Sequence, residues 1–123
     1  MSEHLNESVA VIFRQGGRIL VPPDPLQVPY ENRRSNETFE KTAYRLAADY
    51  GVLHAKIDAP LRTSDDVDAA TRAYLLHDPA GMLERSEFYV EEAEVMNRIF
   101  QHPTLRVADV ALFTTALYAI RLR

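Results

Sequence analysis

Residues 27–52 are the most informative stretch of the sequence, and within them residues 36–51 carry the pattern of one amphipathic helix with defined ends. Apolar side chains recur there at helical spacing and form one face, made by Phe39, Ala43, Leu46 or Ala47, and Tyr50. We expect Asn36 to be the N-cap, and Gly51 suits the left-handed position just after a helix. The pattern predicts a helix over 37–50 that buries this face against another element.

A charged stripe runs along the same predicted helix. Its members are spaced by four residues, so they share one face: Glu37, Lys41, Arg45 and Asp49. Opposite charges at this spacing stabilise a helix by only ~0.2–0.5 kcal/mol per pair. The stripe has two alternative interpretations, a solvated and salt-bridged face, or a site for a metal or an anion.

The rest of the chain alternates between predicted strands and helices. The strands are expected at 8–13, 18–21, 53–57, 71–77 and 88–90, with a turn at Gln15-Gly16-Gly17. A short helix around 95–100 should stop near His102-Pro103, and an apolar helix follows over 107–120. This order predicts an α+β fold. With 123 residues, the chain is expected to form a single domain over 1–123.

The segment 27–52 resembles the signature loop and helix of the Nudix (MutT-like) hydrolase family. That pattern runs G-x5-E-x7-R-E-U-x-E-E-x-G-U, where U is a bulky aliphatic residue. The matching positions are Val28-Pro29, Glu37, Arg45 and Gly51-Val52. The resemblance implies a Nudix-like α/β/α sandwich, in which a mixed sheet lies between helices.

The same segment departs from the family pattern where that family does chemistry. Tyr30 and Glu31 occupy the two glycine positions, Arg34 stands where a glutamate is usual, and Asn36 replaces a later glycine. Of the three carboxylates in the Arg-Glu and Glu-Glu pairs of the helix, only one remains, as Asp49. The sequence therefore predicts a degenerate Nudix box.

The lost carboxylates bear on the metal that the resemblance implies. Diphosphate hydrolysis needs Mg²⁺ or Mn²⁺ to neutralise phosphate oxygens and to activate water, and Mg²⁺ prefers a near-octahedral set of oxygen ligands. Asp49 is the candidate metal ligand, but Arg45 one turn away would repel a divalent cation. We therefore expect binding of a nucleotide-type or other phosphorylated ligand, or of a protein partner, rather than hydrolysis.

In this binding hypothesis, Arg33, Arg34 and Arg45 supply guanidinium groups, which pair well with phosphate. Tyr30 either stacks on a nucleobase or ribose, or fills the space that the glycine pair leaves to substrate. In the first of these roles, Tyr30 would join Arg33 and Arg34 as a ligand-binding residue.

The alternative hypothesis is a divergent metal-dependent hydrolase of nucleoside diphosphates linked to another moiety. Its catalytic residues would be Asp49, Glu37 and Arg45, with Mg²⁺ or Mn²⁺ bound at Asp49 and help from a late glutamate: Glu91, Glu92 or Glu94. A third hypothesis is an interaction module that uses the helix 107–120 to form a homodimer or to bind a partner.

Composition and net charge limit the classes of partner and of chemistry that we expect for this protein. The formal net charge of −4 argues against broad nucleic-acid affinity, which needs a basic patch. The chain has no cysteine, so disulfides and thiolate chemistry are excluded. No apolar run approaches the ~20 residues of a membrane span, and the N-terminus does not resemble a secretion signal. We therefore expect a cytoplasmic protein without a membrane partner.

Overall fold

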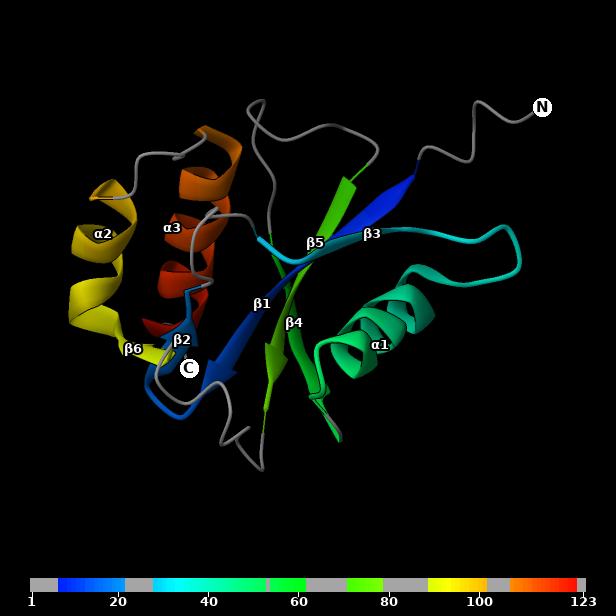
Figure 1. Ribbon diagram of the computed structural model, residues 1–123, viewed down its shortest axis with the longest axis horizontal. Coiled ribbons are helices and arrows are strands. Elements are labelled where there is room, and N and C mark those ends of the chain that lie inside the picture. The colour runs from blue at the N-terminus through cyan, green and yellow to red at the C-terminus, as the bar shows by residue number, and fades with distance from the viewer. Residues whose placement is uncertain are drawn as a thin grey trace.

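One mixed β-sheet forms the centre of the protein, and helices cover both of its faces (Figure 1). The computed structural model describes residues 7–21, 28–52, 54–61, 71–78, 89–101 and 107–121. In this part of the chain, the strands are β1 (Ser8–Gln15), β2 (Arg18–Leu20), β3 (Tyr30–Asn32), β4 (Lys56–Leu61), β5 (Thr71–His77) and β6 (Tyr89–Glu91).

Strand β1 is the central strand of the sheet. It pairs in parallel with β5, and it pairs antiparallel with β3 at its start and with β2 at its end. Strands β4 and β6 pair antiparallel with β5 and β2, which gives the order β4-β5-β1-β2-β6. Parallel neighbours need a crossover connection, and the segment between β1 and β5 supplies it.

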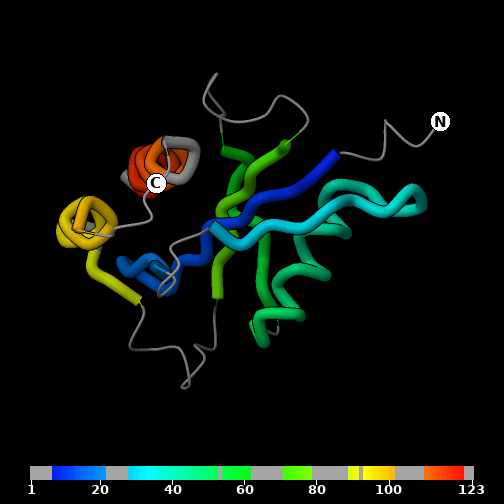
Figure 2. Tube along the Cα trace, turned by 45° about the horizontal axis from the view of Figure 1, so that its top comes forward, coloured from blue at the N-terminus to red at the C-terminus, as the bar shows by residue number. Residues whose placement is uncertain are grey.

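Helix α1 (Phe39–Asp49) lies on one face of the sheet, while α2 (Glu92–Phe100) and α3 (Val107–Arg121) lie on the other (Figures 1 and 2). Successive side chains of β1 point to opposite faces, so its apolar run feeds two cores. Val9, Val11 and Phe13 pack in the core under α1, and Ala10 and Ile12 pack in the core under α2 and α3. This arrangement confirms the predicted α+β fold class, an α/β/α sandwich with a mixed sheet.

The ends of α1 differ in part from the prediction. The helix begins at Phe39, and its N-cap is Thr38, whose hydroxyl accepts a hydrogen bond from the Lys41 amide at 3.1 Å. The prediction of Asn36 as N-cap was wrong, because Asn36 lies in the turn before the helix. At the other end, Gly51 adopts the expected left-handed conformation, with a φ of 77°.

Two strands differ from the prediction. Strand β3 was not expected, since its residues fall in the signature loop; it forms because its backbone pairs with β1. The strand expected at 53–57 is β4, which instead begins at Lys56 and contains an irregularity between Ile57 and Ala59. Leu53, Phe88 and the expected helix stop at His102-Pro103 lie outside the described residues.

The predicted apolar C-terminal helix is α3, and much of its apolar surface belongs to the core. Its buried side chains are Leu112, Phe113, Ala116 and Leu117. Tyr118 points away from this core and is 65% exposed. Within the described residues, none of the helices combines the length and the hydropathy that a membrane span requires.

Candidate functional site at the start of helix α1

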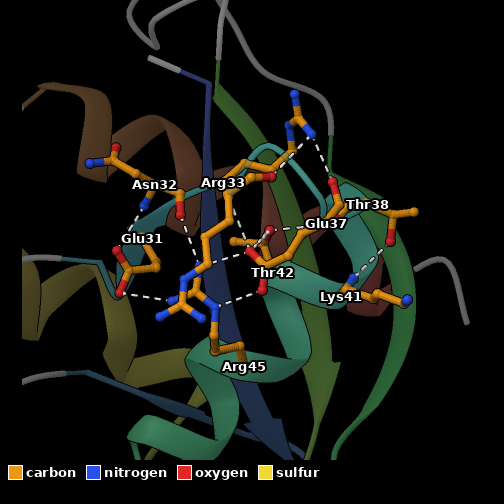
Figure 3. A network of polar contacts seen from close by, with 9 residues as sticks. Glu31, Asn32, Arg33, Glu37, Thr38, Lys41, Thr42 and Arg45 are labelled. Carbon is orange, nitrogen blue, oxygen red and sulfur yellow. Dashed lines mark hydrogen bonds and ion pairs between the residues drawn. The ribbon is translucent and has the colours of Figure 1, made fainter. Parts of the chain in front are cut away.

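An ion pair between Arg45 and Glu37 links helix α1 to the loop that joins it to β3 (Figure 3). The Arg45 Nε and Nη2 atoms donate to the two carboxylate oxygens of Glu37, at 2.8 Å and 2.9 Å. Such bidentate pairs are stronger and more directional than a single hydrogen bond. Because Glu37 precedes the helix, the predicted four-residue stripe is not one helical face: Glu37 folds back onto α1 instead.

The Glu37 carboxylate has further donors. The Thr42 hydroxyl donates to Oε1 at 3.0 Å, and the Arg34 backbone amide donates to the same oxygen at 3.1 Å. The hydrogen bonds from Arg45 hold the pKa of Glu37 far below its ordinary value of 4.5, at about 2; burial opposes this shift, and the Arg34 amide and the Thr42 hydroxyl add to it. Glu37 is therefore a structural anion and a poor candidate for a general base near neutral pH.

The Arg45 guanidinium also binds strand β3. Its Nη2 donates to the Asn32 carbonyl at 3.0 Å, and its Nη1 lies 3.4 Å from a Glu31 carboxylate oxygen. Its pKa is raised, chiefly by the hydrogen bonds to Glu37. With these partners on all three of its nitrogens, Arg45 braces β3 against α1. Few of its donors are left for a ligand.

Arg33 makes a second set of internal contacts. It forms an ion pair with Glu7, and its Nη1 donates to the Glu37 carbonyl at 2.7 Å. Its guanidinium carbon also lies 5.2 Å from the centre of the Phe39 ring, and that of Arg72 lies 4.2 Å from the same ring. Two cations therefore gather over one aromatic ring at the first residue of α1, an arrangement in which cation–π attraction contributes.

The other two expected ligand contacts are exposed. Arg34 lies in the loop, where its carbonyl accepts a hydrogen bond from the Glu37 amide at 3.0 Å, and its residue is exposed to solvent. Tyr30 lies on β3 opposite Ala10, and it is 51% exposed. Tyr30 therefore does not fill a buried pocket, and a stacking role is the alternative that its exposure permits.

The expected metal ligands do not gather around one point. Asp49 is exposed in the last turn of α1. Glu91 pairs with Arg18 at 3.0 Å, and Glu94 is exposed on α2, across the sheet from α1 (Figure 1); the Glu92 side chain lies outside the described residues.

Over the described ranges of the chain, no three His, Asp or Glu side chains come together as a metal site would need. Together with the occupied Glu37 carboxylate, these positions do not fit the oxygen cage of Mg²⁺ or Mn²⁺.

Sequence reasoning missed three contributors to this segment. Thr42 is fully buried and bonds to Glu37, the Asn32 carbonyl binds Arg45, and Arg72 approaches from β5. The first had a signal, because a threonine within the apolar face of a helix needs a partner for its hydroxyl. The other two depend on strand pairing, which local spacing does not reveal.

Comparison with known proteins shows which solved structures share this fold. The sequence matches no family model, and a sequence comparison with curated proteins found no match. Among solved structures, the Nudix hydrolase RenU of M. smegmatis has a TM-score of 0.64 at 16% identity, covering 95% of this chain and 87% of that one. The DNA mismatch repair protein MutT of methicillin-resistant Staphylococcus aureus 252 has a TM-score of 0.62 at 12% identity, covering 92% and 95%.

A third similar structure, the E. coli ORF135 protein, has a TM-score of 0.59 at 18% identity, covering 95% of this chain and 91% of that one. The likeness extends over most of each chain and concerns the arrangement of the sheet and helices. The chain has the α/β/α sandwich fold of the Nudix hydrolases.

Proposed function

We propose that this protein binds a nucleotide-type or other phosphorylated ligand without a metal, on a Nudix-like fold whose hydrolase site is degenerate. The observation that carries this proposal is the bidentate Arg45–Glu37 pair. A carboxylate that is bonded to a guanidinium, a hydroxyl and an amide has little capacity left for a metal. The same pair holds the loop before α1 against the helix. The loop and helix therefore keep their arrangement although the metal-binding carboxylates of the Nudix pattern are missing.

Ligand contacts fall to the exposed residues of this segment. Arg34 offers a guanidinium on the solvent side of the loop, and Tyr30 offers an exposed ring on β3. Guanidinium groups pair with phosphate and aromatic rings stack on bases. Arg33 and Arg45 act as positioning residues, because their donors are engaged by Glu7 and Glu37.

Thermal unfolding with ADP, ADP-ribose and UDP-glucose tests the proposal, with EDTA in one series and Mn²⁺ in the other. A ligand at about one hundred times its dissociation constant adds ~2.7 kcal/mol to the free energy of unfolding. We expect a shift in the EDTA series with the ligand recovered intact. Arg34→Gln should reduce the shift, while Arg98→Gln, an exposed arginine of α2, should leave it unchanged.

Two outcomes contradict the proposal. Cleavage of a ligand that needs Mn²⁺ and disappears in Asp49→Asn would establish the divergent hydrolase instead. The absence of any shift across the panel would contradict binding of phosphorylated small molecules. A protein partner or a homodimer would then be the remaining hypotheses.

A further inference from the structure

An open pocket of about 410 Å³ lies where the β4–β5 pair meets the first turn of α1. It is formed by three residues of β4, the first four residues of β5 and one residue of the helix: Ile57, Pro60, Leu61, Thr71, Arg72, Ala73, Tyr74 and Glu40. Small-molecule pockets typically measure roughly 300–1,000 Å³. The volume suits a small ligand.

The pocket combines an apolar wall with two opposite charges. Ile57 and Pro60 form the apolar wall on β4, whereas the Leu61 side chain belongs to the core on the opposite face of the sheet. Glu40 contributes a carboxylate from α1, and Arg72 contributes a guanidinium from β5. Both charged residues are exposed, and no ion pair joins them within the described parts of the chain.

Tyr74 lines the same pocket as these two charged residues. Tyr74 is buried, and its pKa is raised first by that burial and then by Glu40, while Arg72 opposes the shift. The phenol therefore stays protonated at neutral pH and is both a donor and an acceptor. Arg72 is further positioned by its contact with the Phe39 ring. A cation and an anion beside an apolar wall complement a ligand that carries both charges and an apolar body.

We propose that this pocket binds a free α-amino acid with an apolar side chain. The ligand carboxylate would pair with Arg72, its ammonium group would pair with Glu40, and its side chain would pack against Ile57 and Pro60. This inference does not depend on the function proposed above, because none of these residues belongs to the Arg34–Tyr30 surface.

Calorimetric titration of the full chain with L-leucine at up to millimolar concentration tests the site. We expect one molecule of leucine to bind. Isoamylamine, which lacks the carboxylate, and 4-methylpentanoate, which lacks the amine, should each bind at least about tenfold more weakly, because each loses one charge-assisted hydrogen-bonded pair. Glycine should also bind more weakly, because it lacks the apolar side chain.

Single substitutions test whether Arg72 and Glu40 each bind one charged group of the ligand. Arg72→Gln and Glu40→Gln should each weaken leucine binding about tenfold or more. The matched controls Arg98→Gln and Glu94→Gln, on exposed positions of α2, should leave it unchanged. Unchanged thermal midpoints would show that all four variants are folded, and the conservative Arg72→Lys should retain part of the affinity.

The inference is overturned if leucine, isoleucine, valine and methionine all fail to bind, or if leucine binds equally well to the Arg72→Gln and Glu40→Gln proteins. It is also overturned if 4-methylpentanoate binds as tightly as leucine, since Glu40 would then recognise nothing. The nucleotide series described above has its own readout at Arg34, so either proposal can fail while the other stands.

Discussion

The guanidinium of Arg45 binds both carboxylate oxygens of Glu37, a residue that precedes the helix on which Arg45 lies. The pair joins the loop to α1, and the additional contacts of Arg45 with Asn32 and Glu31 join both to β3. The side chains of Arg45 and Glu37 are only 20% and 13% exposed, so solvent screens the pair less than it screens a surface ion pair.

Removal of either partner should therefore destabilise the protein. We expect Arg45→Gln and Glu37→Gln each to lower the thermal midpoint by several degrees, because each leaves a partly buried charge without its partner. The double variant should lose less than the sum of the two single losses, which is the signature of a direct interaction. Arg18→Gln, which breaks the mostly exposed pair with Glu91, is the matched control and should change the midpoint little. Additive losses would show that Arg45 and Glu37 act separately.

The depressed pKa of Glu37 predicts how this contribution depends on pH. A carboxyl with a lower pKa in the folded state than in the unfolded state stabilises the fold above the unfolded value. That contribution is lost as the pH falls from the ordinary pKa of 4.5 through the folded value of about 2. The midpoint difference between the wild type and Glu37→Gln should be constant near neutral pH and should shrink over this acid window. A difference that grows as the pH falls would contradict the assignment.

The position of the N-cap gives a stability test that separates two neighbouring residues. The Thr38 hydroxyl accepts a hydrogen bond from the Lys41 amide. Thr38→Ala should therefore lower the free energy of unfolding, measured with denaturant, by about 1 kcal/mol. Asn36 is exposed in the preceding turn, and Asn36→Ala should stay within about 0.5 kcal/mol of the wild type. The reverse order of these two costs would restore Asn36 as the cap.

The sequence was sufficient for much of the fold. The apolar run of β1, the apolar spacing of α1 and the glycine that closes it are local patterns, and each predicted its element. Strand β3 could not be found in this way, because Tyr30, Glu31 and Asn32 carry no strand pattern and become a strand only through pairing with β1. The N-cap was misplaced because asparagine and threonine are both good caps, and only the backbone path decides between them.

The candidate site was less predictable than the fold. Spacing by four predicted that Glu37 and Arg45 would share a helical face, whereas they meet because the loop folds back onto α1. The hydrolase alternative needed a late glutamate near the helix, but Glu91 lies on β6, an edge strand of the sheet, and Glu94 lies on α2, on the face opposite α1 (Figure 1). A single sequence shows which residues are acidic, but the sheet order decides which of them can meet.

We expect the ligand site at the start of α1 to function without a divalent metal, and direct measurement of Mn²⁺ binding tests this most directly. The protein alone would be titrated with Mn²⁺ while electron paramagnetic resonance measures the free ion. We expect no site tighter than the millimolar range, and the same curve for Asp49→Asn. A stoichiometric site with micromolar affinity that disappears in Asp49→Asn would contradict the claim and would return a metal-dependent hydrolase as the better account.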